Sequence, residues 1–528
     1  MSSPHAAVLA WIDDEVDPAA ARELRALMAS GDDAELADRF SGPLTFGTAG
    51  LRGPLRAGPN GMNRAVVRRA AAGLAAWLTA RGHTGRAVVV GYDGRHGSSD
   101  FAHDSAAIFA AAGFEALLLP RLLPTPVLAF AVQHLEAAAG VMVTASHNPP
   151  QDNGYKVYVA DGAQIAPPTD VEIEAAIRAV GPTRQIALDE QAVTVLGESI
   201  VDDYVAAIAG LIGLGPRALR IVHTAMHGVG TEIITKVFAA ARFEPPLKVP
   251  EQAAPDADFP TVAFPNPEEP GALDLALALA RERDADIIIA NDPDADRCAV
   301  AVPFPDGWRM LRGDEVGVLL ADALLHKGVQ GTYATTIVSS TMLQAMAESN
   351  GVGYAETLTG FKWISRAADD LAYGYEEALG YAVAPHLVRD KDGISAALLV
   401  AEYAAALKEH GSSVPQRLDE LATEYGRYAT DQVSMRVDDL ALIEAAMARL
   451  RAAPPSTLLG AAVTVADLLP DSDVLRLTVP GARVVVRPSG TEPKLKAYLE
   501  VVLPEGTAAE AADRLALLRG EAEALLGI

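Results

Sequence analysis

The sequence is poor in cysteine and in positive charge. Cys298 is the only cysteine among 528 residues, so a disulfide-stabilised scaffold is excluded. Lysine and arginine total 43 against 69 aspartates and glutamates, which gives a formal net charge of −26. Because a nucleic-acid backbone is bound by a basic surface, we expect no nucleic-acid partner. Any anionic ligand would have to be held by arginines and lysines concentrated in a few loops.

Long apolar runs are also missing. The most hydrophobic stretch, residues 105–145, is interrupted by Glu115, Arg121 and Glu136, whereas a membrane-spanning helix needs about 20 mostly uncharged residues. The first residues, MSSPHAAVLAWIDDEVD, have no basic segment ahead of an apolar one, as a secretory signal peptide would. We therefore expect no membrane partner and a cytoplasmic location.

Apolar residues are nevertheless plentiful, at 50% of the chain. At about 100–200 residues per domain, the length predicts roughly three to five domains. Short β-rich runs alternate with Ala/Leu-rich helical patterns, for example a strand at 87–92 and a helix at 99–112. This alternation indicates α/β domains. The last hundred residues instead combine long helices, at 440–452 and 508–526, with β patterns, which indicates a smaller α+β domain.

Three aspartates directly follow a predicted buried strand at residues 286–290: Asp292, Asp294 and Asp296. In an extended segment this spacing places all three carboxylates on one face, and Pro293 disfavours a helix. Carboxylates so close together repel one another unless a cation binds, and hard oxygen ligands suit Mg²⁺, with Ca²⁺ as the competitor. The loop lacks the glycine and glutamate that an EF-hand requires at its sixth and twelfth positions. A solvated acidic turn is the alternative.

A serine lies at the carboxyl end of another predicted strand, where open α/β sheets place reactive groups. Residues 140–144 run into Ser146-His147-Asn148-Pro149-Pro150, and Lys156 follows shortly after. No G-x-S-x-G motif surrounds the serine, so an α/β-hydrolase nucleophile is not indicated. A hydroxyl, a turn and a cation within eleven residues could handle phosphate. A plain polar turn is the alternative.

A phosphate-binding pattern occurs near the C-terminus, in Arg487-Pro488-Ser489-Gly490-Thr491. A guanidinium can hold two phosphate oxygens, the two hydroxyls can donate, and glycine lets backbone N–H groups approach closely. The same composition is common in hairpin turns, which is the alternative.

Two further loops carry polar side chains between glycines or aromatics. Thr359-Gly360-Phe361-Lys362-Trp363 places a lysine after a predicted strand. Glu376 and Glu377 lie between Gly374 and Gly380, where they could accept hydrogen bonds from sugar hydroxyls or simply face solvent.

Taken together and in this order, these segments resemble the α-D-phosphohexomutase superfamily, the phosphoglucomutases and phosphomannomutases. The resemblance runs from TFGTAGLRG at residues 45–53 to the Arg487 loop, nearly the whole chain. The sequences of three of these motifs, GTAGLRG, TGFKWI and GYEEALGY, are most similar to one branch of the superfamily. That branch includes bacterial α-phosphoglucomutases and phosphopentomutase-like enzymes. The resemblance implies three related α/β domains with mixed sheets and a smaller C-terminal α+β domain around one central cleft. We place them at residues 1–200, 201–311, 312–427 and 428–528.

The resemblance also implies an activity, the interconversion of hexose 1-phosphate and hexose 6-phosphate. Glucose would be the favoured sugar, with mannose or a pentose as alternatives. Ser146 would be a phosphoserine that gives its phosphoryl group to the sugar, making a hexose 1,6-bisphosphate. Because an escaping bisphosphate leaves the serine bare, hexose 1,6-bisphosphate would be an activator. Mg²⁺ would be bound by Ser146 with Asp292, Asp294 and Asp296.

Roles for charged residues follow from the same resemblance. Arg52, Lys156 and Arg297 would neutralise charge on the transferred phosphoryl group, because phosphoryl transfer depends mainly on positioning and charge stabilisation. Lys156, Lys391 and His386 are the candidates for general acid and base.

The substrate, a small sugar phosphate, would be held by the remaining loops. Its distal phosphate would be bound by Arg487, Ser489, Gly490 and Thr491. We expect the sugar to be bound by Thr359, Gly360, Lys362 and Glu376. The family's sugar loop has a serine two residues after the glutamate, whereas this chain has Ala378. A non-catalytic sugar-phosphate-binding protein and a metal-dependent phosphatase are therefore the rival hypotheses. No long heptad or apolar strip indicates an oligomeric state.

Overall fold

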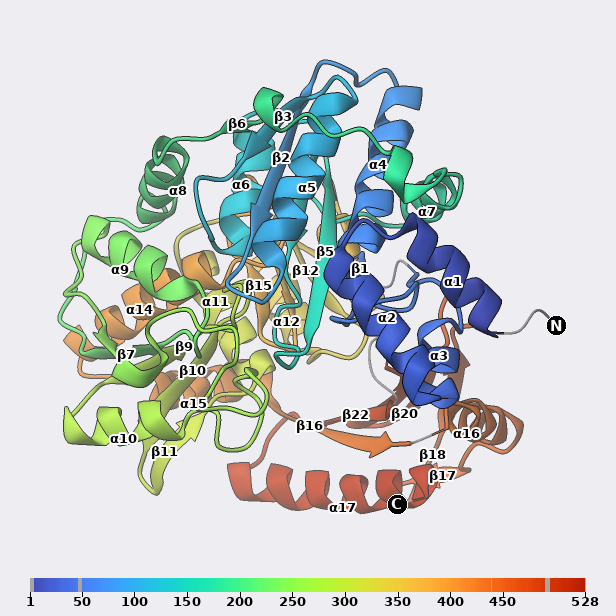
Figure 1. The fold of residues 1–528 in the computed structure, drawn as a ribbon. Coiled ribbons are helices and arrows are strands. Elements are labelled where there is room, and N and C mark those ends of the chain that lie inside the picture. The colour runs from blue at the N-terminus through green and yellow to red at the C-terminus, as the bar shows by residue number, and fades with distance from the viewer. Residues whose placement is uncertain (1–3, 46–49, 438, 490–493, 528) are drawn as a thin grey trace. The chain divides into compact units, whose positions relative to one another are not determined.

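The computed structural model describes residues 4–45, 50–437, 439–489 and 494–527 (Figure 1). The chain forms two compact units: unit 1 contains residues 1–311 and 380–406, and unit 2 contains residues 312–379 and 407–528. No helix in these described ranges is both long and apolar enough to cross a membrane.

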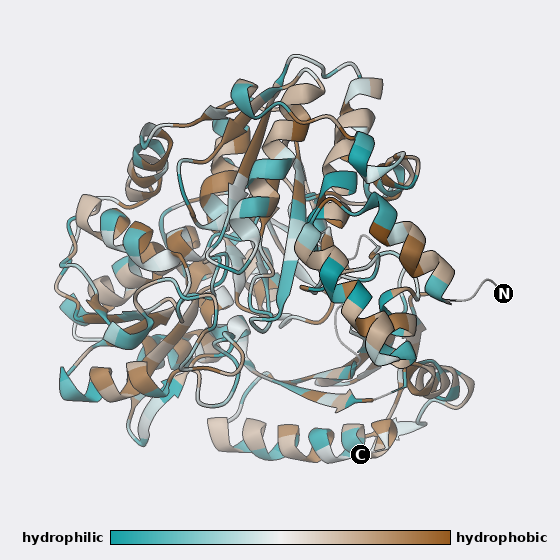
Figure 2. Cartoon of the chain, viewed as in Figure 1, coloured by the Kyte–Doolittle hydropathy of each residue, from teal (hydrophilic) through white to brown (hydrophobic). Residues whose placement is uncertain are grey.

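The first sheet of unit 1 is mixed. Its strand order is β1 (Leu51–Pro54), β5 (Asp152–Val159), β4 (Ala139–Val143), β2 (Ala87–Tyr92), β3 (Glu115–Leu118) and β6 (Thr194–Val195). The last four strands are parallel, whereas β5 and β1 run antiparallel to their neighbours. Strand β4 is buried along its whole length, and Figure 2 shows apolar, brown residues along β2. Such continuous apolar strands are typical of a sheet covered on both faces.

Among the described residues, four α-helices belong to this sheet, and three more precede it at the N-terminus. The helices of the first sheet are α4 (Arg64–Ala80), α5 (Ser98–Ala111), α6 (Thr125–His134) and α7 (Thr169–Arg178). Ahead of them, α1 (Pro4–Asp14), α2 (Pro18–Ser30) and α3 (Asp33–Arg39) enclose a small core of their own around Leu24 and Leu36. Helix α2 begins with Asp17 as N-cap and ends at Gly31, whose φ of 73° suits glycine.

The second sheet of unit 1 is also mixed. Its order is β11 (Gly307–Met310), β10 (Ala299–Phe304), β9 (Ile287–Ala290), β7 (Ile221–Thr224) and β8 (Leu247–Lys248). Its helices are α8 (Ser199–Ala209), α9 (Gly230–Ala240) and α10 (Asp274–Glu282). The returning segment of unit 1 contains β15 (Gly380–Ala382) and the first part of α14 (Gly393–Glu409).

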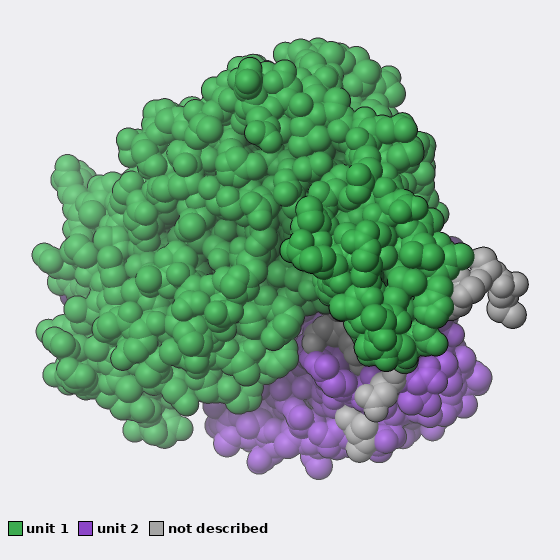
Figure 3. Space-filling model, viewed as in Figure 1, with its two compact units in different colours: residues 1–311, 380–406 green, residues 312–379, 407–528 purple. Residues whose placement is uncertain are grey.

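Unit 2, purple in Figure 3, combines an α/β part with an antiparallel sheet. In the α/β part, β12 (Thr332–Thr336) pairs in parallel with β13 (Gly353–Thr357) and β14 (Leu371–Glu376). Its helices are α11 (Gly313–His326), α12 (Met342–Asn350), α13 (Phe361–Ile364) and α15 (Val414–Tyr425).

The antiparallel sheet of unit 2 lies in the last hundred residues. Its order is β16 (Arg427–Arg436), β22 (Lys494–Leu503), β21 (Ala482–Pro488), β20 (Leu475–Val479) and β19 (Thr464–Asp467). A small hairpin, β17 (Thr457–Leu458) and β18 (Ala461–Ala462), and the helices α16 (Ala441–Ala452) and α17 (Ala508–Leu526) complete this part. The predicted fold class, α/β domains with mixed sheets followed by a smaller α+β domain, is confirmed.

Candidate active site

Ser146 lies just beyond the carboxyl end of β4, in a strained turn. Its φ is 51°, a left-handed conformation that costs a serine about 1 kcal/mol or more. Its N–H donates to Thr144 Oγ1 at 2.9 Å, and its hydroxyl donates to Asp292 Oδ2 at 2.7 Å. His147 Nδ1 lies 3.2 Å from the same hydroxyl. The serine side chain is therefore buried and aimed at the aspartate loop.

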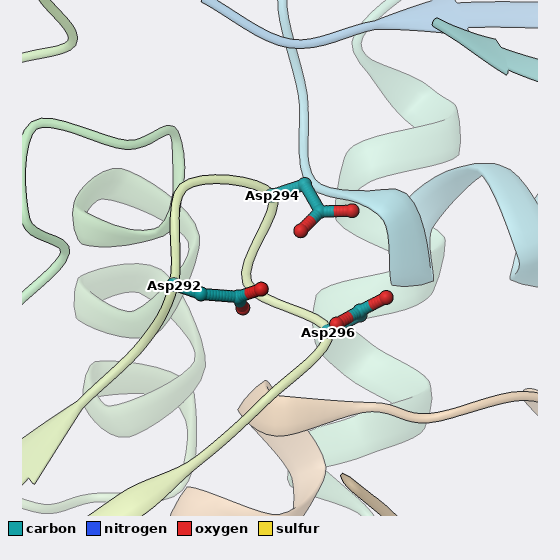
Figure 4. A group of neighbouring side chains, drawn as sticks. All are labelled: Asp292, Asp294 and Asp296. Carbon is teal, nitrogen blue, oxygen red and sulfur yellow. The ribbon is translucent and has the colours of Figure 1, made fainter. Parts of the chain in front are cut away.

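Asp292, Asp294 and Asp296 come together, but through a different local structure from the one the sequence predicted. The segment after β9 is a turn and not an extended strand, because the N–H of Ala295 donates to the carbonyl of Asp292 at 2.9 Å and φ of Ala295 is 55°. One carboxylate oxygen from each aspartate lies within 4.8 Å of the others. Figure 4 shows the three carboxylates facing a common space. The turn achieves the clustering that we had attributed to strand periodicity.

Neighbouring segments hold this turn from outside. A Cβ added at Gly228 would lie 2.3 Å from Cα of Pro293, and the N–H of Val229 donates to the Pro293 carbonyl at 2.8 Å. Thr125 donates twice to Asp294, from its N–H to the carbonyl at 2.9 Å and from its hydroxyl to Oδ2 at 2.6 Å. Neither Thr125 nor Gly228 was predicted from the sequence. The glycines that follow β7 at residues 228 and 230 were the available signal.

Three cations surround the carboxylates. Lys156, on β5, places its Nζ 2.7 Å from both Asp294 Oδ2 and Asp296 Oδ2. Lys391 Nζ lies 3.4 Å from Asp296 Oδ2, and Arg297 Nε lies 4.0 Å from Asp292 and from Asp296. Burial lowers the pKa of Lys156, but Asp294 and Asp296 outweigh it, so the net shift is upward and the lysine stays protonated.

The aspartates differ in their charge balance. Burial raises the pKa of Asp292 well above its usual range, and Asp294 and Asp296 add to the effect. Burial also opposes ionisation of Asp296, but Lys156, Lys391 and Arg297 reverse this and hold its pKa below the usual range. Within the described ranges, the buried Oδ1 atoms of Asp294 and Asp296 accept no hydrogen bond. Three clustered carboxylates with unsatisfied buried oxygens fit a divalent metal.

Arg52 reaches the same loop from the adjacent strand. It lies on β1, which pairs with β5, and its Nη1 donates to Asn148 Oδ1 at 3.0 Å.

Burial, together with Arg297 and Arg52, lowers the pKa of His147 well below its usual value, so the ring is neutral. His386, our third acid–base candidate, is exposed.

The predicted sugar-binding residues lie in unit 2. Thr359 and Gly360, with φ of 110° at the glycine, precede α13, in which Lys362 is 8% exposed. Glu376 ends β14 and is half-buried. Its neighbour Glu377 accepts hydrogen bonds through Oε2 from the hydroxyls of Thr336, at 3.2 Å, and Ser339, at 3.0 Å.

The Arg487 segment is a hairpin connection between β21 and β22. Ser489 donates its N–H to the carbonyl of Lys494 at 2.8 Å, which closes the hairpin. Gly490 and Thr491 lie outside the described residues. In the described part of the chain, the side chain of Arg487 makes no hydrogen bond or ion pair and is half-buried. Arg487 therefore has the capacity to bind an anion.

Unit 1 thus brings together a serine hydroxyl, a buried carboxylate cluster and several cations. The residues concerned are Ser146, Asp292, Asp294, Asp296, Arg52, Lys156, Arg297 and Lys391. Such an arrangement is suited to moving a phosphoryl group, whose transfer depends on positioning and charge stabilisation. The class of protein that this site and the α/β fold define is a phosphotransferase.

The sequence matches four consecutive domain families described as phosphoglucomutase/phosphomannomutase. Alpha/beta/alpha domains I, II and III match residues 43–183, 202–304 and 312–425, and the C-terminal domain matches residues 433–518. The chain belongs to the phosphoglucomutase/phosphomannomutase family, in the α-D-phosphohexomutase superfamily. It is a phosphomutase, an intramolecular phosphotransferase of carbohydrate metabolism.

Similar proteins carry three different substrate names. A probable phosphomannomutase of Haemophilus influenzae is 47% identical over 83% of this chain and 93% of its own length. A phosphopentomutase of Mus musculus is 34% identical, covering 94% and 90%, and a phosphoglucomutase of Staphylococcus haemolyticus is 35% identical, covering 88% and 91%. Among solved structures, a putative phosphomannomutase from Thermus thermophilus superposes with a TM-score of 0.75 at 27% identity, covering 92% of this chain and 99% of that one.

Proposed function

We propose that this phosphomutase interconverts hexose 1-phosphate and hexose 6-phosphate, with glucose as the favoured sugar. The reaction would proceed through phosphorylated Ser146 and a hexose 1,6-bisphosphate. The observation that carries the proposal is the 2.7 Å hydrogen bond from the Ser146 hydroxyl to Asp292. This hydrogen bond holds a serine hydroxyl against a buried carboxylate cluster. A polar turn with no catalytic role would not require such a contact.

Asp292, Asp294 and Asp296, with the phosphate on Ser146, would hold Mg²⁺. The all-oxygen donor set and the unsatisfied Oδ1 atoms of Asp294 and Asp296 support this assignment. When bound, Mg²⁺ would neutralise negative charge on the transferred phosphoryl group.

The residues of the chain account for the remaining steps. In the first transfer, the bond between phosphorus and Ser146 Oγ breaks, and a bond forms to the free hydroxyl of the hexose monophosphate, which loses its proton. In the second, the bond between the other phosphorus and its sugar oxygen breaks, that oxygen takes up a proton, and the phosphoryl group bonds to Ser146 Oγ. Lys156 stays protonated between Asp294 and Asp296 and would act with Arg52 and Arg297 as a fixed cation. We propose Lys391 as the proton carrier.

The substrate would be held by residues of unit 2. Arg487, Ser489, Gly490 and Thr491 would bind the distal phosphate, which the unpartnered side chain of Arg487 in the described part supports. Glu376, with Thr359, Gly360 and Lys362, would contact the sugar. We keep 1–200, 201–311, 312–427 and 428–528 as the proposed domain limits.

The choice of sugar is the finer part of the proposal. The motifs GTAGLRG, TGFKWI and GYEEALGY are most similar to α-phosphoglucomutases and phosphopentomutase-like enzymes, which supports glucose with a pentose as an alternative, whereas the name of the 47% identical relative supports mannose. Ala378, half-buried where the family has a serine, removes one possible hydroxyl contact to the sugar.

A comparison of substrates with the wild-type protein tests the proposal. We expect Mg²⁺-dependent turnover that is highest with glucose 1-phosphate, lower with mannose 1-phosphate and lowest with ribose 1-phosphate. Adding glucose 1,6-bisphosphate should abolish any lag, because it phosphorylates bare Ser146. Intact-mass spectrometry should show one phosphate on the active protein and none on Ser146→Ala. Normal turnover by Ser146→Ala would exclude the phosphoserine route, and faster turnover of another sugar would reassign the substrate.

A further inference from the structure

Arg95 is a buried arginine behind the loop that carries Ser146. It follows β2, is 4% exposed, and points all of its Nη donors at backbone carbonyls of residues 146–152, which we call the serine loop. Nη1 donates to the carbonyls of Pro149, at 2.8 Å, and Asp152, at 3.1 Å. Nη2 donates to the carbonyl of Ser146 at 2.6 Å and to that of Asn148. One side chain thus binds four carbonyls of one short loop.

The serine loop needs this support most at Ser146 and Asn148, which lie outside the strands; by contrast, Asp152 begins β5 and its N–H donates to the Pro149 carbonyl at 3.1 Å. Ser146 has a φ of 51°, which is unfavourable without tertiary restraint. No described backbone N–H donates to the carbonyl of Ser146 or to that of Asn148. Buried carbonyls without a donor are costly, so removing Arg95 would favour a different course of the loop.

Arg95 is itself fixed from two sides. Its Nε lies 3.5 Å from Asp93 Oδ2, and Asp93 Oδ1 accepts hydrogen bonds from the Arg95 N–H and from the Ser98 hydroxyl. The guanidinium carbon lies 4.9 Å from the ring centre of Phe259, in the connection that follows β8. The planar guanidinium is therefore held in one orientation between an acid, an aromatic ring and the loop.

We propose that Arg95 is a positioning residue that fixes the serine loop and thereby keeps the Ser146 hydroxyl at the carboxylate cluster. In the described part of the chain, Arg95 makes no hydrogen bond or ion pair with the Ser146 hydroxyl, with Asp292, Asp294 or Asp296, or with any residue assigned to the sugar. Its contacts with the serine loop are all to backbone carbonyls, and its charge, which also acts on Asp294 and Asp292, is kept when it is replaced by lysine. The inference rests on the proposed role of Ser146 as the phosphoryl carrier. Its consequence is that loss of Arg95 slows the transfer step and leaves substrate affinity largely unchanged.

Arg95→Lys tests this inference, with Arg39→Lys as the matched control. Lysine keeps the charge but has one nitrogen, so it cannot span four carbonyls. Arg39 is also buried in unit 1, where it pairs with Glu23 and Glu35 and donates to the Ala57 carbonyl, but it has no contact with the serine loop. Both variants lose buried interactions of an arginine, but only Arg95→Lys loses hydrogen bonds to the serine loop.

Two readouts are measured on the full chain of each variant. Amide hydrogen exchange follows residues 146–152, which needs no activity. Steady-state kinetics with glucose 1-phosphate separates kcat from KM. For Arg95→Lys we expect faster exchange confined to the serine loop and a kcat lower by about 100-fold, the scale of a displacement of about 1 Å, with KM changed less than threefold. Arg39→Lys should lower the melting temperature and leave kcat and loop exchange at wild-type values.

The outcomes separate the inference from the function on which it rests. Unchanged loop exchange in Arg95→Lys overturns the inference, and so does faster exchange with unchanged kcat. A rise in KM with constant kcat would also overturn it, because it would make Arg95 a binding residue. A wild-type protein with no mutase activity and no phosphate on Ser146 would instead overturn the proposed function, while loop exchange would still decide whether Arg95 holds the loop.

Discussion

Single residues in the aspartate cluster have opposite charge balances, although their spacing in the sequence makes them look equivalent. Asp294 shares Lys156 with Asp296 and accepts a hydrogen bond from Thr125, whereas Asp292 accepts hydrogen bonds from a hydroxyl and a backbone N–H and lies 4.0 Å from Arg297 Nε. Removing a buried carboxylate that is paired at short range leaves its cation uncompensated and destabilises the fold, whereas removing one that burial and like charges disfavour does not.

We therefore predict opposite effects of Asp292→Asn and Asp294→Asn on the metal-free protein. Asp294→Asn should lower the free energy of unfolding by about 1.5–3 kcal/mol, the value of a charged hydrogen bond. Asp292→Asn should leave it unchanged or raise it, because a repelled charge is removed. Both variants should need more Mg²⁺ for half-maximal activity. Urea unfolding in EDTA and Mg²⁺ titration of activity measure the two effects, and identical Mg²⁺ curves would exclude this loop as the metal site.

Arg487→Lys should reduce binding of the distal phosphate more than the retained charge suggests. A lysine offers a point charge where arginine offers two parallel donors. We expect a loss of about 1.5–3 kcal/mol, or roughly ten- to hundredfold in kcat/KM, in both reaction directions. A residue that only shaped the β21–β22 hairpin would lower the melting temperature and leave the kinetics unchanged. Measuring both on the same preparation distinguishes these roles.

Among the elements, the loop between β7 and α9 fixes the turn that carries Asp292, Asp294 and Asp296, because the two backbones approach closely. A methyl group at Gly228 would overlap the backbone of Pro293. Gly228→Ala should therefore destabilise the protein by about 1–3 kcal/mol, the usual cost of overpacking, and weaken Mg²⁺-dependent activity. Gly213→Ala is the control, because a Cβ there meets nothing within 4 Å. Equal melting temperatures and equal Mg²⁺ requirements for the two variants would contradict this role of Gly228.

The loop between β12 and α12 predicts a pH dependence of stability in unit 2. Asp314, on α11, accepts a hydrogen bond from the Ser340 N–H at 2.7 Å, and burial raises its pKa from 3.8 to about 7, with Glu377 and Glu500 adding to the effect. The folded state therefore holds this proton more tightly than the unfolded state. As pH rises from about 4 to about 7, the free energy of unfolding should fall by up to about 1.4 kcal/mol per pH unit.

Asp314→Asn removes that titration, so its melting temperature should exceed that of the wild type at pH 8 and approach it at pH 4. Asp306→Asn provides the control, because it removes an exposed carboxylate and leaves the buried Asp314 in place. A parallel pH profile for Asp314→Asn and the wild type would show that Asp314 ionises normally.

Elements with strong periodicity were predictable from the sequence to within a residue or two. The predicted strand 87–92 is β2 and the predicted helix 99–112 is α5, because their patterns reflect burial of a whole strand or of one helix face. The three N-terminal helices were not predicted, although Asp17 and Gly31 cap one of them. Strand β5 was also missed, since its sequence DNGYKVYV begins with residues typical of a turn.

The candidate site was predictable where neighbouring residues in the sequence act together, as in Ser146 with Lys156 or the three aspartates. Arg95, Thr125 and Gly228 could not be found in this way. Their roles depend on segments that are far apart in the sequence and meet only in the folded unit. No local pattern distinguishes an arginine that will bind four distant carbonyls from one that will face solvent.

At the scale of the whole molecule, unit 1 is discontinuous and depends on residues 380–406. Asp390 accepts hydrogen bonds from the Tyr158 hydroxyl and the Gln164 amide, both at 2.7 Å, and Asp392 accepts one from Tyr204 at 3.0 Å. Without this segment, several buried donors lose their partners. A chain of residues 1–311 should therefore melt at a lower temperature than unit 1 in the full chain. A truncated chain that melts like the full protein would contradict this dependence.

The same discontinuity constrains how the protein is made. The ribosome synthesises the serine loop and the turn with Asp292, Asp294 and Asp296 long before Lys391, and it must synthesise all of residues 312–379 in between. Translation proceeds at about 5–20 residues per second, so several seconds pass before the last segment of unit 1 is synthesised. During this time Tyr158 and Gln164 lack their hydrogen-bond acceptor, Asp390. A nascent chain that folds domain by domain from its N-terminus cannot complete this active site first. The catalytic centre is finished only after most of the polypeptide has emerged.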